Sequence, residues 1–134
     1  MITTGWDNLG KFVLRVGVAA LLLLHGINKI QHGTSFIEGL LDKNGLPTFM
    51  AYGAYVGEVL APALVIVGFQ TRLSALVMAG TMGMAIFLAH ASDLGRLTAH
   101  GGWSIELPAL FLIGSLAIAC LGPGRFSIEG RRRV

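Results

Sequence analysis

Residues 12–30 read FVLRVGVAALLLLHGINKI, an apolar run interrupted by Arg15 near its start and by His25 and Lys29 near its end. A helix needs about 20 such residues to cross the hydrocarbon core of a bilayer. The rest of the chain has the same character, because 54% of its 134 residues are hydrophobic and 13% are charged. Soluble domains carry about 25% charged residues. The sequence therefore predicts a protein that folds in lipid.

Three further apolar runs of similar length follow, at about residues 49–69, 73–91 and 105–121. Gly122, Pro123 and Gly124 end the last run with a strong helix stop. The pattern predicts an all-α protein, a four-transmembrane-helix bundle that forms a single domain over residues 1–134. Between the first two runs, residues 35–47 read SFIEGLLDKNGLP, which predicts a short helix lying in the membrane interface.

The distribution of basic residues predicts the orientation of the bundle. One side carries most of them, and by the positive-inside rule that side faces the cytoplasm. Both termini are therefore expected in the cytoplasm, and Arg15 and Arg72 are expected to be anchors at the membrane interface. The basic residues on this side are Lys11, Arg15, Arg72, Arg125, Arg131, Arg132 and Arg133. The last three form a local tail rather than a face for nucleic acid.

Five ionisable side chains fall within the outer half of the predicted spans: His25, Lys29, Glu58, His90 and Glu106. A charged group at the bilayer centre costs roughly 2.5–3.5 kcal/mol and generally faces the interior of the bundle. Because His25 and Lys29 are four residues apart, they are expected to share a helix face. That face is expected to look into an outward-opening polar pocket with Glu58 at its floor.

Pro62 supports this position for Glu58, because a proline within a helix has no N–H to donate to the carbonyl four residues earlier. Structural explanations stay open for the same residues. Glu58 could serve as the partner of Lys29 or His25 in a purely structural salt bridge. Positions near the membrane boundary would account for Lys29, His90 and Tyr55. Interaction with the helix dipole would account for Glu106, which lies in the first turn of the fourth run.

Metal and haem sites have weaker support in the sequence. The single cysteine, Cys120, excludes a disulfide within the chain and any site built from several cysteines. His25 and His90 are the residue types of bis-histidine haem ligation, and His90, His100 and Glu106 could ligate a metal. The sequence does not define the geometry of the outer loop around the second set, so no metal ligand is assigned, and haem is kept as a weak alternative.

Small residues recur at four-residue spacing in the second and third runs. Such stripes let membrane helices approach closely, within one bundle or between copies of a chain, although the same residues are also common in membrane helices generally. The stripes consist of Gly53, Gly57 and Ala61 in the second run and of Ala75, Ala79 and Gly83 in the third.

Several stretches match a known family in the family's order. They are RVGVAALLLLHGINKI (15–30), AYGAYVGEVLAPALVIVGFQTRLSAL (51–76), the run ending at His90, GGWSIELPALFL (101–112) and GPGRFSIEG (122–130). On these stretches the chain resembles the DoxX family of membrane proteins. One departure is Glu129, which stands where relatives often carry aspartate. The resemblance implies a four-helix bundle in a bacterial inner membrane, with diverse functions that include quinone-linked oxidation alongside redox partner proteins.

The first functional hypothesis is a quinone-binding redox subunit. Glu58 and His25 would be its catalytic residues, exchanging protons with the quinone oxygens, while a partner protein or a bound haem supplies electrons. Further ligand contacts would come from Lys29, His90, Glu106 and Tyr55. The alternative is a non-enzymatic scaffold, receptor or assembly factor that forms homo- or hetero-oligomers, with a periplasmic partner docked on its outer side. The lack of a complete catalytic set favours this alternative. A third hypothesis, transport of a small solute, has less support because the sequence has only four predicted spans and no evident inverted repeat.

Overall fold

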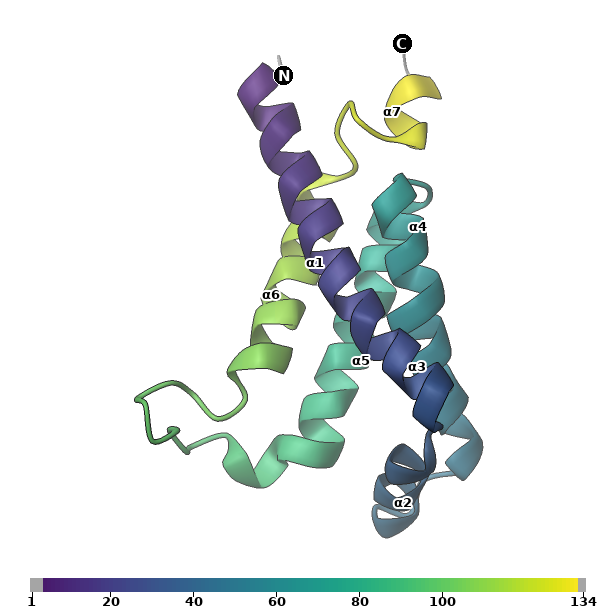
Figure 1. The fold of residues 1–134 in the computed structure, drawn as a ribbon, viewed down its shortest axis with the longest axis vertical. Helices are drawn as coiled ribbons and strands as arrows, with labels where there is room; N and C mark the ends of the chain where they lie inside the picture. The colour runs from purple at the N-terminus through teal and green to yellow at the C-terminus, as the bar shows by residue number, and fades with distance from the viewer. Residues whose placement is uncertain (1–3, 133–134) are drawn as a thin grey trace.

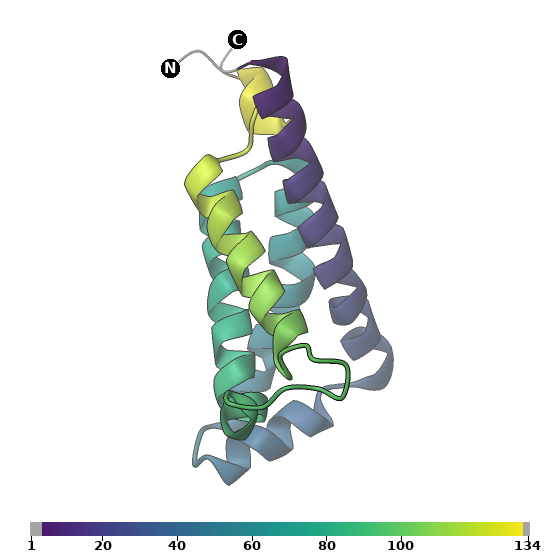
Figure 2. The same ribbon diagram turned by 90° about the vertical axis from the view of Figure 1, so that its left-hand side faces the viewer.

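The computed structural model describes residues 4–132, which fold into helices and form no β-strand. The helices run up and down in a bundle, and α7 lies at the same end as the start of α1 (Figures 1 and 2). The α-helices are α1 (Gly5–His32), α2 (Ser35–Lys43), α3 (Gly53–Tyr55), α4 (Ala61–Val67), α5 (Thr71–His90), α6 (Glu106–Leu121) and α7 (Ile128–Arg132). Arg133, the last residue of the predicted basic tail, lies outside the described residues.

The first helix has well-defined ends. Thr4 accepts a hydrogen bond from the backbone N–H of Asp7 at 3.1 Å, and the Asp7 carboxylate accepts one from the N–H of Thr4 at 3.1 Å. This reciprocal capping box satisfies donors that the first turn would otherwise leave free. At the other end Gly33 has φ +82°, and its N–H donates to the carbonyl of Lys29 at 2.7 Å.

Residues 48–67 form one continuous helical rod whose hydrogen-bonding pattern changes along its length. It begins as a 3₁₀ helix (η1, Thr48–Tyr52), continues as α3, passes through a π-helix (η2, Val56–Leu60) and ends as α4. Pro47 precedes the rod with φ −61°. Pro62 lies in the first turn of α4, directly after the π-helix. The rod is thus irregular in the half that carries Glu58.

Three helical segments are long and apolar enough to cross a membrane, namely Gly5–His32, Thr48–Val67 and Thr71–Asp93. The last of them is α5 extended by a 3₁₀ turn (η3, Ala91–Asp93). The fourth predicted span coincides with α6, an apolar helix of 16 residues. A helical membrane bundle, as the sequence predicts, is therefore confirmed, and α2 forms where a short connecting helix is expected.

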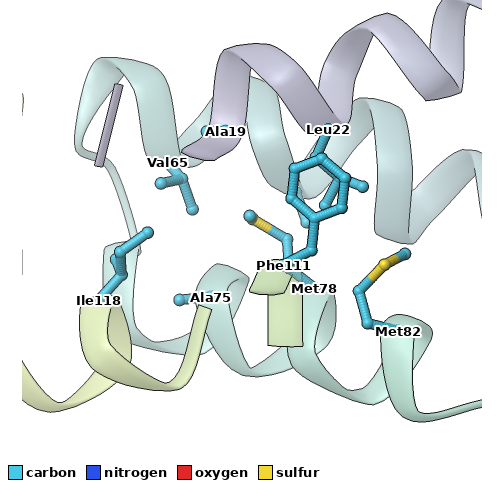
Figure 3. Close-up of a cluster of buried hydrophobic side chains, with 9 residues drawn as sticks. Ala19, Leu22, Val65, Ala75, Met78, Met82, Phe111 and Ile118 are labelled. Carbon is cyan, nitrogen blue, oxygen red and sulfur yellow. The ribbon is translucent and has the colours of Figure 1, made fainter. Parts of the chain in front are cut away.

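The interior of the bundle is small, and most large apolar side chains point outward. At most 39% of the apolar window in any of the three long segments is buried, so these helices are apolar on nearly all sides. This pattern is typical of helices surrounded by lipid. The core itself draws side chains from α1, α4, α5 and α6 (Figure 3). Its members are Ala19, Leu22, Ala61, Val65, Ala75, Met78, Met82, Phe111 and Ile118.

The predicted small-residue stripes take part in this packing at some positions. Gly57 lies against α5 so closely that an added Cβ would be 1.8 Å from the hydroxyl oxygen of Thr81. Ala61, Ala75 and Ala79 are buried. In contrast, an added Cβ at Gly53 or Gly83 would meet nothing within 4 Å. Part of each stripe therefore serves contacts within the bundle.

Arg15 is buried, and the prediction that it is an interfacial anchor is wrong. Its side chain is 1% exposed. Its guanidinium donates to the carbonyl of Val65 at 2.7 Å, to that of Ile66 at 2.5 Å, and to that of Phe126. Arg15 thus satisfies carbonyls at the end of α4 and holds the C-terminal segment against the bundle.

Two other charged side chains act on helix ends at this side of the molecule. Glu129 on α7 accepts hydrogen bonds from the backbone N–H and the hydroxyl of Thr71 at 2.7 and 2.9 Å, which caps the start of α5. Arg72 remains exposed, as expected for an interfacial residue, and donates to the carbonyls of Ala119 and Cys120 at the end of α6 at 3.2 and 3.1 Å. The family-like ending GPGRFSIEG is therefore part of the fold.

We expect the Arg15→Met variant to lose roughly 3 kcal/mol or more of unfolding free energy, because it leaves buried carbonyls without a donor. Arg15→Lys should recover only part of the loss, since one ammonium cannot reach carbonyls from two segments as a guanidinium does. Denaturant titration of the detergent-solubilised protein measures both. Arg96→Met is the control, because the Arg96 side chain is 73% exposed. If Arg15→Met unfolded at the same denaturant concentration as the wild type, Arg15 would not stabilise the fold through these carbonyls.

Candidate functional site

A cavity of about 500 Å³ lies between α2, the first half of the 48–67 rod and α5. Most of its wall is apolar, including Ile37, Leu41, Met50 and Leu88. The polar side chains that line it are Lys29, Glu58, Thr81 and His90. Small-molecule sites in proteins have this composition, an apolar wall with a few polar groups that fix orientation.

The Glu58 carboxylate and the Lys29 ammonium form a close ion pair at this cavity. The Nζ atom of Lys29 lies 2.9 Å from Oε1 and 2.8 Å from Oε2 of Glu58. The Glu58 side chain is 6% exposed and that of Lys29 is 25% exposed. The salt bridge named above as a structural explanation is therefore present. The pair also lines the cavity, so its presence does not exclude a role in binding.

The local backbone explains how a glutamate reaches this position. Glu58 is the central residue of the π-helix Val56–Leu60, in which the N–H of Ala61 donates to the carbonyl of Val56. Pro62 follows and has no N–H to offer the carbonyl of Glu58. A single π-turn widens a helix and rotates the residues beyond it, and such turns occur frequently at functional sites.

A glycine on α1 provides the space for the carbonyl of Glu58, which lacks the usual helical donor because Pro62 has no N–H. A Cβ atom added to Gly26 would lie 2.2 Å from the carbonyl oxygen of Glu58 and 2.7 Å from Cγ2 of Val59. No larger residue fits without moving α1 or the π-helix. Gly26 lies one turn before Lys29 on the same helix, so this close approach also brings the Lys29 ammonium to the carboxylate.

His90 lies at the end of α5, among the residues that line the cavity from that helix. Its Nδ1 atom is 3.9 Å from Oδ2 of Asp93, and Oδ1 of the same carboxylate is 3.9 Å from a guanidinium nitrogen of Arg96. These are long contacts between half-exposed or exposed groups, which generally contribute little to stability. His90 therefore lines the cavity without a close ion-pair partner among residues 4–132.

The other predicted site residues do not line the cavity. His25 is exposed, its Nδ1 lies 3.0 Å from the carbonyl of Leu21, and its ring packs edge-on against Phe111 on α6 at 5.3 Å between ring centroids. Tyr55 donates to the carbonyl of Lys29 at 3.4 Å and lines a separate apolar hollow. Glu106 is exposed in the first turn of α6. The expectation of a face shared by His25 and Lys29 at the pocket thus holds for Lys29 alone.

The weaker cofactor arrangements also find no support in the geometry. His90 lines the cavity and His25 does not, so the two histidines considered for haem are not brought together around one space. Within residues 4–132, no group of three or more His, Cys, Asp or Glu side chains is close enough to hold a metal ion. His90, His100 and Glu106 accordingly form no such group.

Sequence reasoning missed three features of the site. It did not identify Thr81, it did not identify Gly26 as a contact, and it did not assign α2 as a wall of the cavity. A signal existed for Gly26, because a glycine directly after His25 interrupts a run of strong helix formers and often marks close packing. No comparable signal marks Thr81, whose hydroxyl also donates to the carbonyl of Val77 at 2.8 Å.

We expect Gly26→Ala to destabilise the protein by about 1–3 kcal/mol, since overpacking forces the backbone to shift. Gly17 on the same helix is the matched control, because a Cβ added there meets nothing within 4 Å. Gly17→Ala should be neutral or stabilising by up to about 1 kcal/mol, as alanine favours the helix. Thermal unfolding in detergent measures both. Equal stability of the two variants would refute the close contact at Gly26.

The ion pair predicts an asymmetric response to removal of one charge. Lys29→Met leaves the buried Glu58 carboxylate unpaired and should cost roughly 3 kcal/mol. Glu58→Met should cost less, because a freed lysine can extend its amine to the interface. The double variant should recover much of the loss, because replacing a buried pair by apolar residues is often nearly neutral. Strictly additive losses in this double-mutant cycle would show that the two groups do not interact.

Comparison with known proteins agrees with the architecture. The DoxX family model matches residues 10–91. A Bacillus subtilis protein named "Putative oxidoreductase CatD" is 31% identical over 114 residues, which cover 85% of this chain and 80% of that protein. An uncharacterised membrane protein of Mycobacterium tuberculosis is 30% identical, over 88% of this chain and 78% of its own. The inner membrane protein YqjF of Escherichia coli is 29% identical over 92% of both chains.

No solved structure matches the chain. The family match covers more than half of the sequence, in the region that contains most of α1, the 48–67 rod and α5. Those elements supply the Lys29–Glu58 pair, the π-helix and His90. With apolar helices, a small interior and relatives that are membrane proteins, the chain is an integral membrane protein, and it belongs to the DoxX family.

Proposed function

We propose that the chain is a membrane subunit whose cavity binds a quinone or a similar small, hydrophobic, redox-active molecule. The observation that carries this proposal is the ion pair at a mostly apolar cavity of about 500 Å³ inside a membrane protein. Sites for small molecules commonly measure 300–1,000 Å³. A flat apolar ring fits the methionine and leucine wall, and its carbonyl oxygens need a few polar partners.

The polar residues of the cavity have distinct parts in the proposal. The Lys29 ammonium donates to one ligand oxygen and stabilises negative charge that develops there during reduction. The Glu58 carboxylate and the His90 imidazole are the groups that exchange protons with the ligand. His25, Tyr55 and Glu106 lie outside the cavity, and the proposal gives them no contact with the ligand.

Full reduction of a quinone to a quinol takes two electrons and two protons. In the proposal a partner redox protein supplies the electrons, and the chain supplies the binding site and the proton-exchanging groups. The name of the B. subtilis relative is consistent with redox chemistry in the family. The proposed protein is thus an accessory subunit of an oxidoreductase, with homo- or hetero-oligomeric assembly.

The same geometry suggests how the protein lies in its membrane. In the proposal all four apolar helices cross the bilayer, α2 lies in the outer interface, and the chain termini face the cytoplasm. The basic residues at the end that contains α7 support this orientation by the positive-inside rule. A plasma-membrane location is consistent with the name of the E. coli relative.

A scaffold or assembly role is the second candidate, and one observation favours it. The Lys29–Glu58 pair is complete without a ligand, with both carboxylate oxygens within 2.9 Å of the amine. A self-satisfied pair can serve the fold alone. If so, the cavity would be an incidental gap under α2, and filling it would not affect any bound molecule.

Filling the cavity separates the two candidates. Gly80 lines the cavity, and Gly83 on the same helix does not. A Cβ at either glycine meets nothing within 4 Å, so the first side-chain carbon fits at both positions. Gly80→Leu should weaken binding of a short-chain ubiquinone or menaquinone analogue by about tenfold or more, equivalent to 1.4 kcal/mol. Gly83→Leu should bind like the wild type.

Quenching of intrinsic fluorescence by the quinone, with the protein in nanodiscs, measures this affinity. Equal affinity of the two leucine variants would place the quinone elsewhere and reject the cavity as its site. Absence of quinone binding by the wild type would favour the scaffold. Glu58→Gln distinguishes a polar contact from simple filling, because it preserves shape and removes the charge.

A further inference from the structure

A second hollow of about 750 Å³ lies at the opposite end of the bundle from α2, next to α7. It is formed by the start of α1, the end of α4 and the segment that leads into α7. Phe12, Val67 and Ile128 provide apolar surface, and they are 39%, 46% and 41% exposed. Arg125 and Arg131 also line it. The hollow therefore combines a lipid-facing apolar wall with two positive charges.

No carboxylate within residues 4–132 forms an ion pair with either Arg125 or Arg131. The acidic residue closest in sequence is Glu129, and its Oε1 atom accepts the two hydrogen bonds from Thr71. Both guanidinium groups are exposed. The hollow therefore presents two positive charges that the protein itself does not neutralise.

The segment that carries these arginines is held in a fixed shape. The Ser127 hydroxyl donates to the carbonyl of Gly124 at 2.7 Å and accepts from the N–H of Gly130 at 2.9 Å. The N–H of Arg125 donates to Oδ1 of Asn8 on α1 at 3.1 Å. A Cβ added to Gly130 would be 2.4 Å from the carbonyl oxygen of Gly124, so the backbone at Gly130 packs tightly against the backbone at Gly124.

We propose that this hollow binds one anionic phospholipid, such as phosphatidylglycerol. Arg125 and Arg131 hold the phosphate by charge-assisted hydrogen bonds, for which guanidinium geometry is well suited. One acyl chain lies along Phe12, Val67 and Ile128. The hollow lies where the apolar parts of α1 and α4 meet the polar end of the bundle, the depth at which a phospholipid changes from tail to headgroup.

Two features select this ligand over its competitors. A free phosphate would use the arginines and leave the apolar wall unused. A zwitterionic phospholipid carries its own cation beside the phosphate, which two further cations would repel. A basic residue near a membrane contributes roughly a fivefold gain in affinity for anionic lipid, so the two arginines together contribute about 30-fold.

The test uses the full chain, purified in a neutral detergent and freed of native lipid. Native mass spectrometry compares retention of phosphatidylglycerol and phosphatidylcholine with identical acyl chains. The wild type should retain one phosphatidylglycerol in preference, and Arg125→Gln/Arg131→Gln should bind it about 30-fold more weakly. Lys43→Gln/Arg96→Gln removes two charges from the other end and should bind like the wild type.

Three outcomes would overturn the proposal. They are equal retention of the two lipids by the wild type, equal loss in both double variants, or equal competition by glycerol phosphate, which would indicate a site for a small anion. Ile128→Gln keeps both arginines and should also weaken phosphatidylglycerol binding, because it removes part of the apolar wall. Circular dichroism confirms that each variant is folded.

Discussion

The buried guanidinium of Arg15 is the interaction on which the arrangement of the bundle most depends. A helix that ends near a bilayer leaves backbone carbonyls that lipid cannot satisfy, each costing several kcal/mol. Arg15 reaches from α1 to the end of α4 and to Phe126, so one side chain joins three parts of the chain. With Glu129 capping α5, the end that contains α7 is fixed by charged side chains acting on backbone groups.

The opposite half of the bundle is organised differently. There the helix carrying Glu58 departs from regular geometry through its π-turn, and Gly26 lets α1 lie against the carbonyl of Glu58. The Lys29–Glu58 pair joins α1 to the rod, and α2 covers the space beside it. The chain thus places its irregular backbone and the cavity beside the ion pair in one half of the bundle, while charged side chains bonded to backbone groups hold the helix ends in the other half.

Hydropathy predicted the membrane helices well, because crossing a bilayer imposes a length and a composition that a single sequence displays. The environment of individual charges was harder to predict. Arg15 resembles an interfacial anchor in one dimension, and the carbonyls that make it an internal cap lie 50 and 51 residues away. A four-residue spacing rotates a side chain by about 40° around a helix, enough to turn Lys29 toward Glu58 while His25 faces Phe111 on α6.

The length of α6 has a consequence for the surrounding membrane. Its 16 residues extend about 24 Å, whereas a typical hydrocarbon core is about 30 Å thick. In the four-span arrangement proposed above, local thinning of the bilayer or association of the short helix with neighbouring protein would relieve this hydrophobic mismatch. The loop before α6 also exposes the apolar side chains of Leu94, Leu97 and Trp103. In that arrangement, the face of the bundle that contains α6 would be most stable in a thinner part of the membrane or in contact with another protein.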